Sequence, residues 1–472
     1  MRQLTPQDAS ILFSDTPLAN ANVTFIQIHD QGTVPGGVVR FKQILAHVEN
    51  LLPKAAILRQ RLLHVPFELD DPYWIADEHF DLEYHVRHIA LPRPGDWRQF
   101  CIQVSRIHAR ALDMNRPLWE IYVIEGLDGI DGLPPGSFAL LTKIHRVAID
   151  PERPGRIVEL LHDTTRRPRK AVPPAPWFPE RPPSGVALAL RGALRTALAP
   201  LSAGNPLARL VPVATAFARD ILRPQHATAT RFNSVISPHR VFDTARFDAD
   251  AFERIRGLVA GASAEEAVLA VIGGGLRRYL QAHDELPAPD LTALAADPDA
   301  PPGSPRRQRA LGTAIAGPLA RLQAIHEPRV AAEGPAAPAG LAGCSVVEVP
   351  APAGPLYLCG ARLSYLSALL PIADGMGLVF AVTRYDGHVA ISPTSCRELL
   401  PDPQVLTQCL RAAVQEYLAL VPAAAAPARP TPAGRRRPAA GTPSPRRPSA
   451  RSAATGRPAA PADRPRSRAP RR

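Results

Sequence analysis

The stretch KIHRVAIDP, residues 143–151, combines residue types that acid–base chemistry uses. His145 and Asp150 could support general-base catalysis, in which an imidazole removes a proton from a hydroxyl group near a carboxylate. Arg146 lies between them, and its guanidinium stays protonated at ordinary pH, so it can bind an anion but cannot accept a proton. The sequence therefore predicts either a proton-transfer site at this turn or a turn that has lost its base.

Two apolar runs position this turn. PLWEIYVIEGL (117–127) and SFALLTKIH (137–145) predict buried strands separated by the turn DGIDGLPPG. Amphipathic helices are expected within residues 41–63, where a proline interrupts the pattern, and within residues 97–112. Because side chains alternate along a strand, His145 and Arg146 should point to opposite faces of the sheet.

A second α/β unit begins near Phe232. Its pattern predicts a strand at 239–247, helices at 248–261 and 263–283, strands at 354–367 and 377–393, and a closing helix at 401–420. YDG, Tyr385 to Gly387, predicts a hairpin turn. Between Leu291 and Ser345 the pattern decays into alanine, proline and glycine.

Several stretches occur in a characteristic order: LTPQDASILFSDTP, LDMNRPLWEIYVIEGLDG, KIHRVAID, FNSVISPHR, AVLAVIGGGLRRYL, RLQAIHE and GPLYLCGARL. In this order the chain resembles the bacterial wax ester synthase/diacylglycerol acyltransferase family, which has the chloramphenicol-acetyltransferase-like fold. The resemblance implies an α/β (α+β) protein of two chloramphenicol-acetyltransferase-like halves, each a mixed sheet with packed helices. The expected organisation has two halves: an N-terminal half carrying the turn at 1–165 and a C-terminal half at 231–421. A Pro/Arg-rich linker with interdomain helices joins them at 166–230, and a disordered Arg/Pro/Ala tail follows at 422–472.

The family's turn reads HHxxxDG, and its second histidine is taken as the base. Here His145 matches the first histidine, Arg146 the second, Asp150 the aspartate and Pro151 the glycine. The resemblance implies an O-acyltransferase that moves a fatty acyl group from acyl-CoA to a long-chain alcohol or diacylglycerol. Acyl-CoA would be a cosubstrate, with no bound cofactor or metal. Because Arg146 holds the base position, the alternative is a catalytically inactive relative that binds lipid, acyl-CoA or a partner protein.

The candidate residues follow from this placement. His145 and Asp150 are candidates for catalysis, although a hydrogen-bonded core histidine and a turn-capping carboxylate are the structural alternatives. Arg146 and His239 are candidates for substrate binding, and His239 is also a candidate base. A structural role is expected for the residues that match the family's PLW motif: Pro117, Leu118 and Trp119.

Two further departures from the family accompany the altered turn. The family opens the long helix of its second half with Asn-Asp, whereas this chain has Glu265-Glu266. The family's SNxPG-like loop reads CSVVEVPAPAG here, with no asparagine after Ser345.

The net positive charge is confined to the end of the chain. The net charge is +12, and residues 422–472 supply all of it with 13 arginines and one acid, Asp463. This tail is expected to attract an anionic membrane or lipid-droplet surface. It lacks interleaved aromatic residues, so no specific nucleic-acid partner is expected. Residues 186–222 add apolar helical runs with arginines, which suit either an interdomain helix packed between the halves or a helix on a membrane surface.

Cysteine usage and hydropathy indicate the compartment. The five cysteines contain no C-x-x-C pair, which fits a reducing environment. No apolar run reaches the ~18 residues that a bilayer-spanning helix needs, and the first residues carry no apolar leader. The expected location is cytoplasmic, with a peripheral position at the inner membrane or at lipid inclusions as the alternative.

Overall fold

The computed structural model describes residues 1–167, 183, 185–198, 230–296, 306–331 and 342–421. Its compact unit runs from Met1 to Pro422. The tail expected to be disordered, 422–472, lies outside the described residues, as does most of the linker expected at 166–230.

The KIH strand belongs to a six-stranded sheet. The order is β13–β14–β2–β7–β6–β5, with bounds Tyr357–Leu358, Ala361–Leu369, Asn22–Asp30, Phe138–His145, Trp119–Glu125 and Val86–Ala90. Neighbouring strands are antiparallel except for β5 and β6, which are parallel. The strands predicted from PLWEIYVIEGL and SFALLTKIH are confirmed as β6 and β7.

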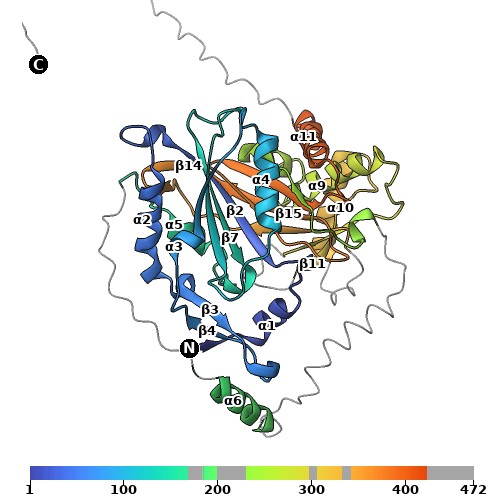
Figure 1. Cartoon of the computed structure of the whole chain (residues 1–472). Helices are drawn as coiled ribbons and strands as arrows, with labels where there is room; N and C mark the ends of the chain where they lie inside the picture. Colours follow the sequence, from blue (N-terminus) through green and yellow to red (C-terminus); the bar gives the residue numbers. More distant parts are fainter. Residues whose placement is uncertain (168–182, 184, 199–229, 297–305, 332–341, 422–472) are drawn as a thin grey trace, which may run out of the picture. The chain divides into compact units, whose positions relative to one another are not determined.

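Strand β14 brings the second part of the chain into this sheet. It pairs with β2 in a register that joins Arg362 to Asp30 at one end and Leu369 to Thr24 at the other. In Figure 1 it lies in the same sheet as β2 and β7. The sheet that carries His145 therefore contains a strand from more than 200 residues further along the chain.

A second sheet has seven strands and mixed pairing. Its order is β11–β10–β12–β15–β16–β8, and β9 also pairs with β16, with bounds Arg307–Ala310, Thr292–Ala295, Cys344–Val349, Val379–Tyr385, His388–Cys396, Arg240–Phe242 and Ala245–Asp248. β10, β12 and β15 are parallel, and the other pairs are antiparallel. The hairpin predicted at YDG is confirmed between β15 and β16, with Asp386 and Gly387 at φ of 49° and 74°.

Regular elements form between Leu291 and Ser345, where the sequence pattern decays. β10, β11, the helix α10 and the start of β12 fall in this segment. β10 is only TALA, yet it is hydrogen-bonded to β11 on one side and to β12 on the other. Pairing with neighbours therefore overrides a composition that carries little strand propensity.

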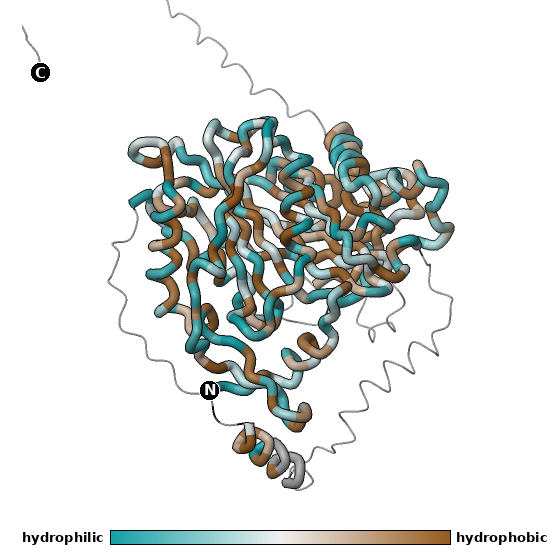
Figure 2. The backbone as a smooth tube through the Cα atoms, in the orientation of Figure 1, coloured by the Kyte–Doolittle hydropathy of each residue, from teal (hydrophilic) through white to brown (hydrophobic). Residues whose placement is uncertain are grey.

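Helices cover the sheets on both sides. The described α-helices are α1 Pro6–Phe13, α2 Phe41–Leu51, α3 Leu82–His85, α4 Trp97–Ala109, α5 Arg156–Leu161, α6 Gly185–Leu198, α8 Ala249–Arg256, α9 Ala264–Gln281, α10 Pro318–Ala331 and α11 Pro403–Leu420. Val104 of α4 shares a buried cluster with Ile26, while Val48 of α2 shares another with Phe25. Adjacent residues of β2 thus face different helices, as strand alternation requires. Figure 2 shows the hydrophobic segments that form these strands and helices.

A small third sheet lies outside the two large ones. It has the order β1–β4–β3, with bounds Arg2–Gln3, Tyr73–Ala76 and Gln60–Leu63. The helical pattern expected across residues 41–63 ends at Leu51, and its last four residues form β3 instead. Among the described helices, none is long and apolar enough to cross a membrane.

Candidate functional site

The backbone at the end of β7 is fixed from both sides. The N–H of His145 donates to the carbonyl oxygen of Leu118 at 2.9 Å, and the N–H of Arg146 donates to that of Ala21 at 2.9 Å. A short 3₁₀-helix, η5, follows at Arg146–Ala148. These contacts set the direction in which each side chain of the turn leaves the sheet.

The ring of His145 is directed inward and fully buried. Its Nδ1 accepts the N–H of Val147 at 3.4 Å, so the proton of the neutral ring lies on Nε2. Nε2 lies 3.3 Å from Oδ2 of Asp15, to which it donates. The other oxygen of Asp15 accepts the N–H of Ala21 at 2.6 Å. Both ring nitrogens therefore have protein partners.

Replacing Asp15 with alanine should lower the free energy of unfolding by about 2 kcal/mol, because the buried Nε2–H of His145 would lose its acceptor. Asp15→Asn keeps one acceptor oxygen and should cost about half as much. Urea unfolding followed by circular dichroism measures the change. Asp131→Ala is the control, since that carboxylate is exposed. Equal stability of Asp15→Ala and the control would contradict the inward-facing His145.

Arg146 faces the other way and is exposed. Its positive charge acts on Arg306, because desolvation and then the charge of Arg146 lower the pKa of the Arg306 guanidinium. Nη1 of Arg306 donates to Oγ of Ser345 at 3.2 Å, at the start of β12. The side of the turn where the family places its base therefore presents positive charge.

Asp150 caps the turn through its side chain. Its Oδ1 accepts the N–H of Glu152 at 3.0 Å, and Oδ2 lies 3.9 Å from Nη1 of Arg156. A little further on, Gly155 allows a close approach: a Cβ there would lie 2.7 Å from the carbonyl oxygen of Pro350. The segment after the turn thus packs against the residue that follows β12.

The PLW residues support the turn from the neighbouring strand. Leu118 is fully buried, and its carbonyl oxygen holds His145 as described above. The indole N–H of Trp119 donates to the carbonyl oxygen of Leu58 at 2.9 Å, and its ring stacks on His85 with centroids 4.6 Å apart. The contacts of these residues are with the protein core.

His239 lies on the surface, held by a carboxylate. Its Nδ1 is 3.0 Å from Oε1 of Glu398, and hydrogen bonds from Ser237 and then His239 lower the pKa of Glu398. The next residue, Arg240, is buried and donates to the carbonyl oxygen of Leu18. Leu18 lies in the loop that carries Asp15, so the stretch SPHR is joined to the turn through that loop.

Sequence reasoning gave no role to Asp15 or Arg240, although both lie in stretches that match the family. It also passed over Lys143, which is fully buried two residues before His145. Its Nζ donates to the carbonyl oxygen of Arg110 at 2.5 Å and lies 3.5 Å from Oε2 of Glu120, and burial lowers its pKa to about 8. In the sequence, the only sign of this buried lysine is its place inside the apolar stretch that predicts the strand.

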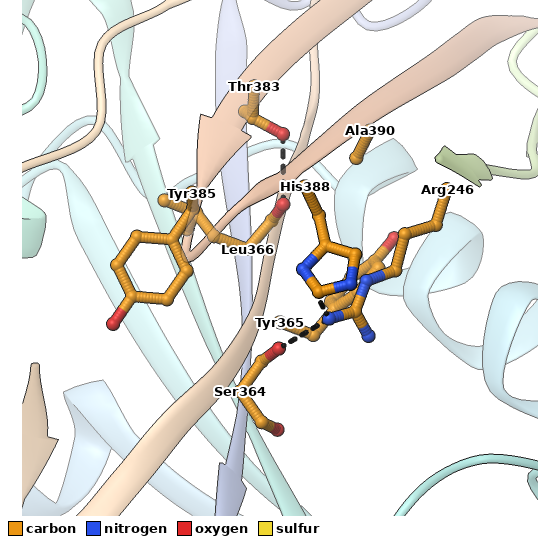
Figure 3. Close-up of a pocket in the computed structure, with 8 residues that line it drawn as sticks. All are labelled: Arg246, Ser364, Tyr365, Leu366, Thr383, Tyr385, His388 and Ala390. Atoms are coloured by element: carbon orange, nitrogen blue, oxygen red, sulfur yellow. Dashed lines mark hydrogen bonds between the residues drawn. The ribbon is translucent and has the colours of Figure 1, made fainter. Parts of the chain in front are cut away.

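Two neighbouring cavities within the described part of the chain lie away from the turn. A cavity of about 210 Å³ is lined by Asp30, Gly132, Leu133, Pro134, Arg246, Arg362, Ser364 and Asp386. Figure 3 shows the adjoining pocket, where Arg246 reaches His388 and donates to the carbonyl oxygen of Ser364. Asp30 and His145 lie at opposite ends of the β2–β7 ladder, so these cavities are not at the turn.

Within the described residues, no group of three or more His, Cys, Asp or Glu side chains could hold a metal ion.

Comparisons with known proteins match most of the chain. The sequence profile of the wax ester synthase/diacylglycerol acyltransferase catalytic domain matches residues 4–263, and that of the WS/DGAT C-terminal domain matches residues 339–417. The O-acyltransferase WSD of Acinetobacter baylyi is 29% identical over 405 residues, which cover 74% of this chain and 84% of that protein.

Two solved structures share the fold. The wax ester synthase/diacylglycerol acyltransferase of Marinobacter aquaeolei VT8 superposes with a TM-score of 0.67 at 23% identity, over 88% of this chain and 99% of that one. The first condensation domain of the calcium-dependent antibiotic synthetase superposes with a TM-score of 0.52 at 15% identity, over 88% and 96%. The expected two-sheet, condensation-domain-like α/β architecture is thereby confirmed.

Proposed function

Because this chain belongs to the wax ester synthase/diacylglycerol acyltransferase family, we propose that it binds acyl-CoA and a long-chain alcohol or diacylglycerol but does not transfer the acyl group. Transfer requires that the acceptor hydroxyl lose its proton as its oxygen attacks the thioester carbon and the CoA thiolate leaves. The observation that carries the proposal is the pair His145 and Arg146. The histidine is engaged with Asp15, and the exposed residue in the base position cannot accept a proton.

The charges around the turn favour binding over proton transfer. Guanidinium groups bind phosphate oxygens well, often through two parallel hydrogen bonds. Arg146 and Arg306 supply two such groups, and the charge of Arg146 contributes to the lowered pKa of Arg306. The phosphates of acyl-CoA are the anions that the family's substrate would bring to them.

The first test measures thiol release from palmitoyl-CoA with and without hexadecanol or diacylglycerol, together with binding of palmitoyl-CoA. We expect binding without acceptor-dependent release. Robust acceptor-dependent release by the unmodified protein would overturn the proposal. Failure to bind palmitoyl-CoA would also overturn it, because the proposal requires that the protein bind acyl-CoA.

Restoring the base should restore turnover in part. Arg146→His with Pro151→Gly is expected to raise acceptor-dependent thiol release at least about tenfold, a fraction of the roughly 10²–10⁴ that a positioned base contributes. The matched control is Arg146→Gln with Pro151→Gly, which removes the same charge and the same proline but adds no base. If both variants release thiol equally, the effect does not come from the imidazole.

The second candidate is an active O-acyltransferase of the same family that uses another base. The observation that favours it is the pair His239 and Glu398, because a carboxylate bound at Nδ1 orients the imidazole so that Nε2 can accept a proton. In that case the unmodified protein would release thiol and the His239→Ala variant would not. The Asp15→Asn variant would release thiol with the same pH profile as the unmodified protein.

A further inference from the structure

Helix α6 carries an apolar face that the described residues do not cover. Val186, Leu190 and Leu194 are 80%, 62% and 54% exposed. Their spacing of four residues places them in one row along the helix. Leu188 lies on the opposite side, is 3% exposed and shares a buried cluster with Val65 and Tyr73. One face of α6 therefore packs against the small sheet. The opposite face of the helix is exposed to solvent.

A second exposed apolar residue lies beside the start of α6. Phe67, in the 3₁₀-helix η4 (Pro66–Glu68), is 89% exposed and has φ of 59° and ψ of 18°. An aromatic residue in the left-handed region is strained, and such strain concentrates at functional positions. A Cβ at Gly185 would lie 3.7 Å from Cγ of Pro66, so η4 and α6 are adjacent.

We propose that Phe67, Val186, Leu190 and Leu194, together the α6 surface, insert into the surface of an anionic lipid membrane. An interfacial helix combines an apolar row with arginines whose long stems lie along it and whose charges reach the lipid headgroups. Arg191 is exposed on α6, and residues 185–198 contain two arginines and no acid. Figure 2 shows the hydrophobic residues of α6.

A lipid surface fits better than a second copy of this chain. Four side chains expose roughly a few hundred Å², whereas a stable dimer buries about 800 Å² on each partner. A bilayer needs no complementary shape and accepts a small apolar row flanked by positive charge. This inference concerns binding alone, so it stands whether or not the protein transfers acyl groups.

The test is co-flotation of the full chain with phosphatidylcholine vesicles containing about 30% phosphatidylglycerol, at low salt and at about 0.5 M NaCl, where long-range attraction by the Arg-rich tail is screened. Leu190→Ser with Leu194→Ser should reduce partitioning at high salt at least about tenfold, because two inserted leucines are lost. The matched control is Val38→Ser with Val235→Ser, two residues 59% and 74% exposed outside the α6 surface.

Phe67→Trp supplies an independent readout. Lipids brominated on their acyl chains should quench the added fluorescence of this variant, relative to the unmodified protein, if residue 67 enters the bilayer. Unchanged partitioning of the leucine variant, an equal loss in the control, or absent quenching would each overturn the proposal. A change in oligomeric state with Leu190→Ser and Leu194→Ser, without loss of flotation, would assign the surface to a second copy instead.

Discussion

Replacing Gly273 with alanine should lower the free energy of unfolding by about 3 kcal/mol or more. A Cβ at this position would lie 1.8 Å from the carbonyl oxygen of Leu311, and a backbone oxygen cannot move aside as a side chain could. Elsewhere in a helix the same change stabilises by about 1 kcal/mol, because glycine is a poor helix former. The predicted sign is therefore the reverse of helix propensity, and it follows from the packing of α9 against this backbone.

Chemical unfolding of Gly273→Ala and of a matched variant measures this effect. Gly257→Ala is the control, because Gly257 has φ of −63° and its nearest atoms would lie 3.4 Å from the new Cβ, an ordinary contact. The control should change stability by no more than about 0.5 kcal/mol. A Gly273→Ala protein as stable as the control would mean that α9 does not lie this close to the residues after β11.

Stability should fall steeply as the pH drops below about 6.5, the ordinary pKa of histidine. His29, His108 and His162 are fully or almost fully buried. Burial lowers the pKa of His162 to about 4, that of His108 to about 3, and that of His29 well below its usual value. Each ring binds a proton more readily in the unfolded chain. The stability that depends on the neutral rings is therefore complete above about 6.5 and is lost as the pH falls toward the folded-state values.

Each histidine should contribute roughly 1.4 kcal/mol per pH unit within this window. Three together remove roughly 4 kcal/mol per unit, against a total of about 5–15 kcal/mol for a typical protein. Burial is the main cause of the lowered pKa values of His29 and His162. Nδ1 of His162 donates to the carbonyl oxygen of Val158 at 2.7 Å, so Nε2 of the neutral His162 ring carries no proton and can accept from Nε2 of His29 at 2.9 Å. A proton added to His162 would remove this acceptor and place a charge beside His29.

Urea unfolding at a series of pH values tests this prediction. Nδ1 of His108 lies 2.9 Å from Oγ1 of Thr24, and the glutamine of His108→Gln can hydrogen-bond to the same hydroxyl. This variant should reduce the slope of stability against pH by about a third, because one of the three buried histidines is lost. His79→Gln is the control, since its side chain is 89% exposed. A slope that is the same in all three proteins would show that other groups govern acid unfolding.

Much of the architecture could be predicted from the chain itself. The alternating pattern of SFALLTKIH and the turn residues of YDG describe local backbone geometry, and both elements form where expected. β10 was missed because four residues with little strand propensity become a strand only between two partners. The place of β14 was also beyond local reasoning, since residues 361–369 could pair with any strand of matching pattern, and the fold joins them to β2.

At the turn, the sequence by itself determined that the residue in the base position cannot act as a base. Arg146 in the base position cannot accept a proton in any fold, because that property belongs to the guanidinium. Only the tertiary structure decided what His145 does. Its partner Asp15 lies 130 residues away, and a hydrogen bond of 3.3 Å between them depends on β2 and β7 pairing so that the loop before β2 reaches the end of β7. Contacts of this kind are set by the packing of distant segments, which no local pattern of residue types records.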